Sequence, residues 1–391
     1  MSEDRSPDQT DVRMDDDPAL RPEREATVGS AGGRRPRGEG LHGEGRAGEG
    51  PRGEGPRGEG ARGEGARGEG ARGQRRRGDR RRGDRSMVPE ADFRSYYGLP
   101  VLNEPTWHAH DIAGYLFLGG LAGASSILAA AAELTGRPRL ARAGKVGALG
   151  AIGGSFYALI HDLGRPARFV NMLRVFKVTS PMSVGTWILS AYGPQAGLAA
   201  VTAVTGRFPR LGLAASAGAG LTGAAVATYT AVLISDTAVP LWHDGHREMP
   251  LLFAGSAMAA AGGLGLLAAP AEEAGPARAT ALLGTALEAA AALRMERRLG
   301  PVAEPLRRGK GRLARLGEGL SAAGALLGAT AGRRSRAAAV VAGAALLAGS
   351  ACTRFGVFHA GVASANDPAY TVEPQRARLA ARERQGSGGP E

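Results

Sequence analysis

The chain has 391 residues, among them 62 glycines and a single cysteine, and its formal net charge is +12. One cysteine, Cys352, excludes an internal disulfide, an iron–sulfur cluster and a cysteine-rich zinc site, because each of these needs several thiols. Charged and apolar residues lie in different parts of the chain, so each part is considered by itself.

Residues 1–86 consist mainly of Arg, Gly, Glu, Asp and Pro. A unit of Arg-Gly-Glu-Gly followed by Pro or Ala recurs between Arg37 and Arg72, and a basic run follows at 75–82. Because this composition buries too little apolar surface to offset the entropy of ordering, we expect a disordered low-complexity arm. Contact of the basic run with anionic lipid or nucleic acid is the alternative, and Met87 is a possible start codon.

A membrane-proximal segment is expected at 87–110, a transmembrane bundle at 111–360 and a tail at 361–391. Long uncharged runs of Ala, Gly, Leu and Val alternate in the bundle with gaps rich in Arg, Lys, His and Asp. Several runs reach the roughly 20 residues that a bilayer demands, whereas the second, sixth and seventh need their flanks. The sequence therefore predicts an all-α, polytopic bundle of about eight helices. The runs are 112–132, 146–160, 178–206, 211–235, 249–271, 279–293, 319–332 and 337–353, and the sixth of them is weaker because Glu288 interrupts it.

Glycines spaced four residues apart are expected to let helices approach closely in lipid, where packing drives helix association. Two such pairs are Gly119 with Gly123, and Gly150 with Gly154.

An even number of spans places both termini at the same end of the bundle, which we call the N-face. The loops after the second and sixth predicted helices also lie there, and they are rich in Arg and Lys. Basic residues accumulate in short cytoplasmic loops, so this count predicts a bacterial inner-membrane protein with its N- and C-termini in the cytoplasm.

The densest polar group runs out of the second predicted helix at the N-face. Asp162 follows His161 and lies about one turn from Tyr157, so a carboxylate, an imidazole and a phenol reach one site. Such groups can exchange protons with a reducible oxygen at the membrane edge, although an interfacial anchor would explain some of them. The loop beyond adds Arg165, Arg168 and Asn171.

Two aromatic residues are expected near the same face. Trp107 precedes the first predicted helix, and Tyr229 lies roughly two turns before Asp236, inside the fourth. The Tyr229 hydroxyl needs a partner in that apolar setting, which is either a ligand or another helix. For the aromatic residues of this face in general, the alternative role is the aromatic belt of membrane proteins.

Resident redox cofactors are not expected. A membrane cytochrome b needs histidines in the middle of facing helices, whereas those of this chain are predicted in loops, in the arm or at helix ends. The chain also lacks a Walker loop, a dinucleotide-binding glycine motif and a nucleophile elbow. We therefore predict no haem, no iron–sulfur cluster and no metal.

The stretch HDLGRPARFVNMLRVFKVTSPMSVGTW, from His161 to Trp187, resembles the NrfD/polysulfide reductase family of membrane subunits. Shorter pieces agree: FRSYYG at 93–98, YLFLGGLAG at 115–123, PLWH at 240–243 and RFGVFHAG at 354–361. The piece YTAVL at 229–233 also agrees, but Ala231 stands where the family usually has Gly. The resemblance covers about 87–376 and is weakest at the sixth and seventh predicted helices.

This resemblance implies a subunit of an oxidoreductase complex, without a redox cofactor of its own, that binds menaquinone. It also implies two partners, an iron–sulfur subunit with four clusters and a molybdopterin catalytic subunit, besides membrane lipid; nucleic acid is not expected.

By position in the family motifs, Asp162 and His161 would handle the quinone-linked proton, and Tyr229 would hydrogen-bond a quinone carbonyl. Arg165 and Arg168 would shape the headgroup pocket or the partner contact. The expected binding site is completed by Asn171, Tyr157 and Trp107.

Two questions stay open at this point. A proton-coupled or solute transporter is the alternative function, for which Glu288 is the only well-placed charge in mid-helix. Several members of the family also face their iron–sulfur partner outside the cytoplasm, whereas the basic residues place the N-face inside. The terminal substrate, the direction of the quinone chemistry and proton pumping are not determined by the sequence.

Overall fold

The computed structural model describes residues 101–103, 105–165 and 167–386. The predicted arm at 1–86 and most of the segment at 87–110 lie outside these residues. The described part is helical and contains no strand. Its eight bundle helices are α1 (Ala109–Leu134), α2 (Pro138–Leu163), α4 (Pro181–Thr205), α5 (Pro209–Ser235), α7 (Met249–Ala268), α8 (Gly275–Leu299), α9 (Arg312–Ala329) and α10 (Arg336–Asn366).

Short helices connect or extend the bundle helices, all of them within the described residues. They are α3 (Ala167–Met172), α6 (Pro240–Asp244), η1 (Gly245–Arg247), η2 (Gly300–Arg307), η3 (Gly309–Gly311), η4 (Ala331–Arg333) and the C-terminal α11 (Ala369–Gly386).

Proline and glycine fix several helix boundaries. A proline stands in the first turn of α2, α4, α5, α7 and α8, where its missing N–H costs nothing and its fixed φ suits the helix. Gly164 and Gly206 end α2 and α4 with φ of 68° and 69°, a left-handed conformation that glycine adopts without strain. Gly164 thus ends α2 where the loop to α4 begins, at the same end of the bundle as the start of α1.

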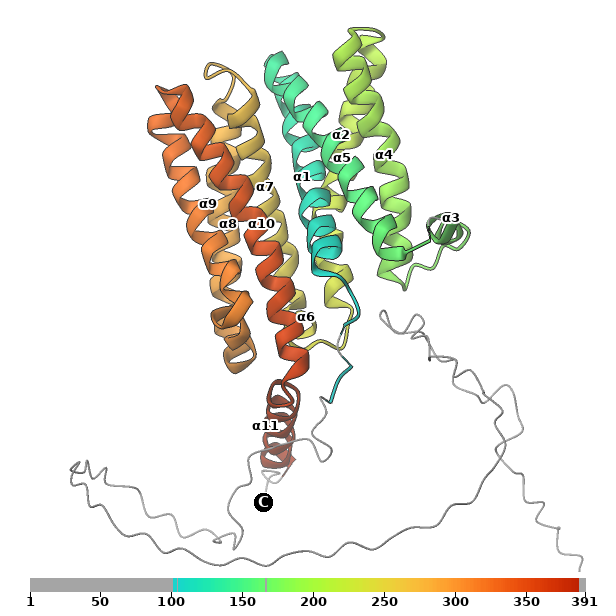
Figure 1. Cartoon of the computed structure of the whole chain (residues 1–391), viewed down its shortest axis with the longest axis vertical. Helices are drawn as coiled ribbons and strands as arrows, with labels where there is room; N and C mark the ends of the chain where they lie inside the picture. Colours follow the sequence, from blue (N-terminus) through green and yellow to red (C-terminus); the bar gives the residue numbers. More distant parts are fainter. Residues whose placement is uncertain (1–100, 104, 166, 387–391) are drawn as a thin grey trace, which may run out of the picture. The chain divides into compact units, whose positions relative to one another are not determined.

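The bundle helices pack as two groups of four (Figure 1). The first group comprises α1, α2, α4 and α5, and the second comprises α7, α8, α9 and α10. The groups meet where α1 contacts α7 and α10, and where α5 contacts α7.

The first group is held together by a close crossing of α1 and α5. A Cβ atom added at Gly223 would lie 2.6 Å from the backbone oxygen of Gly123 and 3.1 Å from its Cα, so the two backbones touch. This is the close approach expected for Gly123. A Cβ at Gly119 would meet Ser155 Oγ at 3.4 Å and one at Gly154 would meet Leu118 Cδ1 at 3.0 Å, whereas one at Gly150 would meet nothing within 4 Å.

The chain is an integral membrane protein. Within the described residues, α1, α2, α5, α7 and α10 are the five helices long and apolar enough to cross a membrane. Large apolar side chains also point outward from the bundle: Leu221 on α5 is 80% exposed, Leu283 on α8 is 64% and Leu326 on α9 is 63%. A bilayer covers such side chains, whereas water would not. The eight predicted runs correspond, in order, to the eight bundle helices, which confirms the predicted fold class.

The last bundle helix is longer than the uncharged run at 337–353 indicates. It continues from Thr353 to Asn366 and carries Arg354 and His359 within it, so His359 lies in a helix and not at its end. The run stops at the arginine charge, but the helix continues because the Arg354 side chain finds its partners inside the bundle. Most of the remaining residues, predicted as a tail, form α11.

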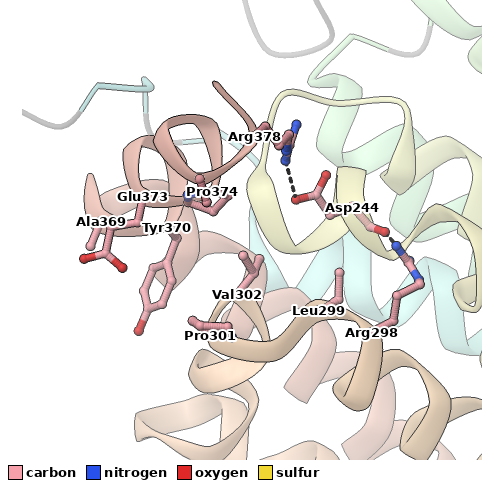
Figure 2. Close-up of a pocket in the computed structure, with 11 residues that line it drawn as sticks. Asp244, Arg298, Leu299, Pro301, Val302, Ala369, Tyr370, Glu373, Pro374 and Arg378 are labelled. Carbon is pink, nitrogen blue, oxygen red and sulfur yellow. Dashed lines mark hydrogen bonds and ion pairs between the residues drawn. The ribbon is translucent and has the colours of Figure 1, made fainter. Parts of the chain in front are cut away.

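α11 packs against the N-face through polar contacts and leaves a pocket beneath it (Figure 2). The Tyr370 hydroxyl donates to Glu304 Oε2 at 3.0 Å, and Arg378 lies 3.4 Å from the Asp244 carboxylate. Burial and the nearby Glu304 carboxylate raise the pKa of Tyr370 to about 12, so this phenol stays a donor at neutral pH.

Candidate functional site

The candidate site lies at the N-face end of the first helix group, where α1 begins and α2 ends. Two histidine–aspartate pairs link these helix ends. His161 Nδ1 lies 2.9 Å from Asp111 Oδ2, and His108 Nδ1 lies 3.8 Å from Asp162 Oδ1. The side chains of Asp111 and Asp162 are only 16% and 18% exposed, whereas those of the two histidines reach solvent. Each carboxylate therefore faces the protein interior and has an imidazole on its solvent side.

A small pocket, with a cavity volume of about 80 Å³, extends from Asp162 into the first group. Most of its wall is aliphatic or aromatic, with a carboxylate, two phenols and one hydroxyl among the side chains. A mainly apolar pocket with a few polar groups is typical of small-molecule sites. The lining residues are Trp107, Ile112, Tyr115, Leu116, Leu159, Asp162, Leu163, Met172, Met182, Thr186, Leu189, Tyr229, Leu233 and Ile234.

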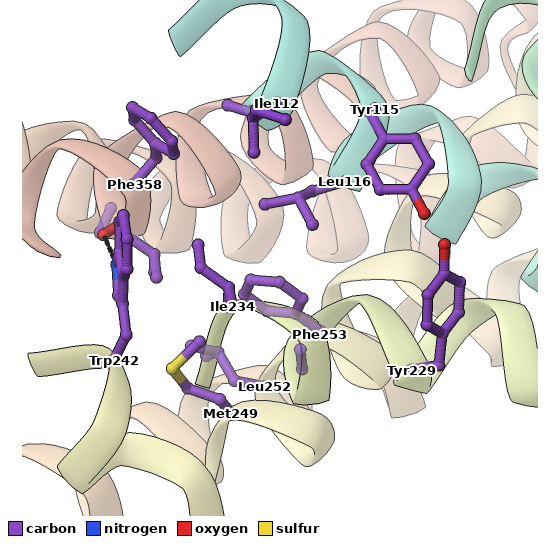
Figure 3. Packing of buried hydrophobic residues seen from close by; sticks show 14 of the residues in the cluster. Ile112, Tyr115, Leu116, Tyr229, Ile234, Trp242, Met249, Leu252, Phe253 and Phe358 are labelled. Atoms are coloured by element: carbon purple, nitrogen blue, oxygen red, sulfur yellow. Dashed lines mark hydrogen bonds between the residues drawn. The ribbon is translucent and has the colours of Figure 1, made fainter. Parts of the chain in front are cut away.

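Two tyrosines form the inner part of this pocket. Tyr115 on α1 and Tyr229 on α5 point their hydroxyl groups toward each other from opposite helices (Figure 3). A Cβ at position 185 would lie 2.9 Å from Cδ2 and Cζ of Tyr229, so the ring fits against α4 only because Gly185 has no side chain. The position of the Tyr229 phenol thus depends on α4 as well as on its own helix.

The entrance of the pocket carries an aromatic residue from the segment before α1. Trp107 stacks on the fully buried Trp242 of α6, with ring centroids 6.0 Å apart. The Trp242 indole N–H donates to the carbonyl of Val357 on α10 at 2.9 Å. A Cβ at Gly361 would meet the Trp242 ring, so glycine at that position leaves room for the indole. The second helix group therefore helps to position Trp107.

Three of the eight residues predicted for the site line this pocket, namely Asp162, Tyr229 and Trp107. His161 is paired with Asp111 on the solvent side, and Tyr157, which is 72% exposed, stacks on the His161 ring at 6.0 Å. The other three lie outside the pocket. The exposed Arg168 donates to the Leu163 carbonyl at 2.9 Å, Arg165 is exposed in the loop after α2, and Asn171 is exposed on α3.

Sequence reasoning did not single out Tyr115 and Thr186 as site residues. Both lie inside uncharged runs, and both line the pocket. Tyr115 stands one helical turn after Asp111, so the spacing of these two polar residues was the available signal.

A second buried polar cluster lies in the other helix group. Glu288 on α8 is 1% exposed, and its Oε1 accepts a hydrogen bond of 2.7 Å from Thr353. The fully buried Arg354 donates to the Phe253 carbonyl at 2.7 Å, and its guanidinium lies 3.8 Å from the centre of the Phe253 ring. Buried charges in a membrane bundle are costly, and they usually have a function.

Part of the chain is similar to a known protein family. Residues 98–274 match the sequence model of the family described as polysulphide reductase, NrfD. Residues 98–274 belong to the NrfD family. No curated protein matches the chain.

The NrfD match includes every residue that lines the pocket, since the lining residues lie between Trp107 and Ile234. It ends before α8, so Glu288 and Arg354 lie beyond it. The family consists of membrane subunits of quinone-linked oxidoreductases, whose partners are iron–sulfur and molybdopterin subunits. The pocket of the first helix group therefore lies wholly within the matched residues.

Proposed function

We propose that this chain exchanges electrons between menaquinone and an iron–sulfur partner with four clusters, which is itself bound to a molybdopterin catalytic subunit in a bacterial inner membrane. The supporting observation is the pocket that Asp162, Tyr229 and Trp107 line at the N-face end of the first helix group. Its apolar walls suit a quinone ring, and its few polar groups suit the two quinone carbonyls.

The residues of the pocket divide the work by chemistry. When bound, a quinone supplies a carrier for two electrons and two protons. The Asp162 carboxylate would hold a proton beside the pocket, and His108, at 3.8 Å, would connect this carboxylate with water. The Tyr229 hydroxyl would donate a hydrogen bond toward a carbonyl oxygen, while the apolar walls exclude water.

Substitutions at Asp162 and Tyr229 test this proposal. Asp162→Asn keeps the size of the side chain and removes its ionisation, so it should lower quinone-linked turnover by at least about 100-fold, a typical contribution of a positioned acid or base. Tyr229→Phe should mainly raise the KM for the quinone. Asp236→Asn changes an exposed aspartate at the end of α5, and it serves as the matched control.

Turnover is measured on the purified complex with a soluble quinol analogue, and assembly is checked by the presence of both partner subunits. Equal turnover for Asp162→Asn and Asp236→Asn in an intact complex would reject the proposal.

We infer the orientation of the chain in the membrane from the distribution of basic residues. We place the N-face in the cytoplasm because it receives the basic loop after α2 and the basic segment between Arg294 and Arg315. A fusion of alkaline phosphatase to the C-terminus should then be inactive, and an active fusion would place the N-face outside.

A proton-coupled transporter is a second candidate, favoured by the buried Glu288 and its bond to Thr353. In that case Glu288→Gln would stop a measurable proton flux into proteoliposomes, whereas Asp162→Asn would not. The quinone proposal instead requires that Glu288→Gln leave quinone turnover within about threefold of wild type, because Glu288 lies outside the pocket.

A further inference from the structure

Four side chains with metal-binding chemistry meet where α1 begins and α2 ends. One donor atom each from His108, Asp111 and Asp162 lies within 4.8 Å of the other two. His161 adds a second imidazole, whose Nδ1 is 2.9 Å from Asp111 Oδ2. One imidazole and two carboxylates thus lie around one point beside the pocket, and a second imidazole lies next to one of these carboxylates.

This donor set matches the preferences of first-row divalent cations. Imidazole nitrogen and carboxylate oxygen bind Zn²⁺ at about 2.0–2.2 Å, so two donors on one ion lie within about 4.4 Å of each other. The three mutually close donors are nearly at this spacing, and the rings of His108 and His161, 79% and 62% exposed, can turn to complete it. With neutral imidazoles, the two carboxylates give the cluster a net negative charge that attracts a dication.

The protein holds the two carboxylates in place before any ion binds. Asp111 lies in the first turn of α1 and Asp162 in the last turn of α2, and both are more than four-fifths buried. Two histidine–aspartate pairs that merely tie the helices together would account for the distances, but they would leave the cluster without affinity for metal.

We propose that His108, Asp111, His161 and Asp162 form a site for a divalent cation such as Zn²⁺, and that an ion bound there inhibits the chain. The ion would occupy the Asp162 carboxylate, which lines the pocket, and so withdraw it from any ligand in the pocket. The binding site stands on geometry alone, whereas the inhibition rests on the proposed quinone function.

Binding is tested on the full-length, metal-free chain in detergent, without quinone. We expect one Co²⁺ per chain with the visible absorption of a low-coordinate Co²⁺ ion, displaced by Zn²⁺, with the Zn²⁺ affinity measured by calorimetry. His108→Ala and Asp111→Asn should each weaken metal binding at least about tenfold, since even residues that only hydrogen-bond to a metal ligand change the metal affinity by that much. The matched control is His110→Ala, in which the lost ring is exposed and contacts Phe355 instead.

Thermal unfolding of each variant shows that it is folded. The absence of stoichiometric binding, or equal affinities for His108→Ala and His110→Ala, would overturn the site.

Inhibition is tested on the purified complex by titrating Zn²⁺ against quinone-linked turnover. The Zn²⁺ concentration for half inhibition should rise at least about tenfold in His108→Ala, relative to its own activity without metal, and stay unchanged in His110→Ala. Zn²⁺ that binds without slowing turnover would overturn the inhibition and leave the site. A normal Co²⁺ spectrum in a complex that never reacts with quinone would instead reject the proposed function, so the two failures are distinguishable.

Discussion

At the scale of single residues, Gly185 controls the position of the Tyr229 ring. A Cβ at position 185 would come within 2.9 Å of Tyr229 Cδ2 and Cζ, and an aromatic ring cannot bend away from it. Gly185→Ala should therefore tilt the phenol and raise the KM for quinone roughly tenfold with a smaller change in kcat, as expected when ground-state binding is lost.

The control for this prediction is Gly197→Ala on the same helix, where the nearest atom, Leu149 Cδ1, is 4.0 Å from the added Cβ. Steady-state kinetics of both variants measure the effect, and equal KM values would contradict the role given to Gly185.

The same pocket shows which of its lining residues a single sequence can reveal. Asp162 and Trp107 were predictable because they flank apolar runs, where a polar or amphipathic side chain is uncommon and indicates a function. Tyr115 and Thr186 lie within such runs and join the site only because α1 and α4 pack on either side of it. The pairing of helices depends on complementary surfaces, which hydropathy does not record.

At the scale of helices, the crossing of α1 and α5 tolerates no side chain. Gly223→Ala would place a Cβ 2.6 Å from the Gly123 backbone oxygen, so the helices would have to separate. Overpacking of this kind typically costs about 1–3 kcal/mol, and the melting temperature in detergent should fall by several degrees.

Gly150→Ala on α2 is the matched substitution, since its Cβ would have no neighbour within 4 Å. Circular dichroism on heating compares the two variants, and a Gly223→Ala protein as stable as Gly150→Ala would show that the crossing is looser than described.

Helix lengths were underpredicted where a charged residue ended an uncharged run inside a helix. The run at 279–293 corresponds to the 25 residues of α8, and the run at 337–353 to the 31 residues of α10. In α10 the run stops at Arg354, whose partner Phe253 lies on the neighbouring α7, and in α8 the run stops at Arg278 and Arg294. Hydropathy treats a charge such as that of Arg354 as exposed, although the fold buries it and gives it hydrogen-bond partners.

At the scale of the whole molecule, an ion pair at the N-face links the start of α7 to the end of α8. The nearly fully buried carboxylate of Glu248 accepts from Arg298 Nη2 at 2.6 Å and Nε at 2.9 Å. These hydrogen bonds, aided by the charges of Arg298 and Arg294, hold the pKa of Glu248 below its usual value.

A lowered pKa in the folded state means that the pair stabilises the fold above the unfolded pKa of about 4.3 and loses this effect as the pH falls through the folded value. Glu248→Gln should therefore lower the melting temperature at pH 7, and its difference from wild type should shrink below about pH 4, where the native carboxyl also becomes neutral. Melting curves of both proteins between pH 3 and pH 8 measure this trend, and a difference independent of pH would contradict it.

The order and alternating direction of the eight bundle helices followed from the sequence, because each apolar run must cross the bilayer and short loops must return the chain. Their division into two groups of four did not, since it depends on which helix surfaces fit together. The predicted site lies within the first group. Its polar residues stand at the start of α1 and at the end of α2, which follow each other in the chain, and this closeness in sequence made the site predictable.

The stacking of Trp107 on Trp242 gives the molecule a built-in optical probe. The sequence contains three tryptophans, and these two lie 6.0 Å apart, one of them in the pocket wall and the other fully buried. Their emission should change when an aromatic oxidant enters the pocket, while Trp187, which is 41% exposed, supplies a separate background signal. Native fluorescence can therefore follow occupancy in real time, without a label and without any partner subunit.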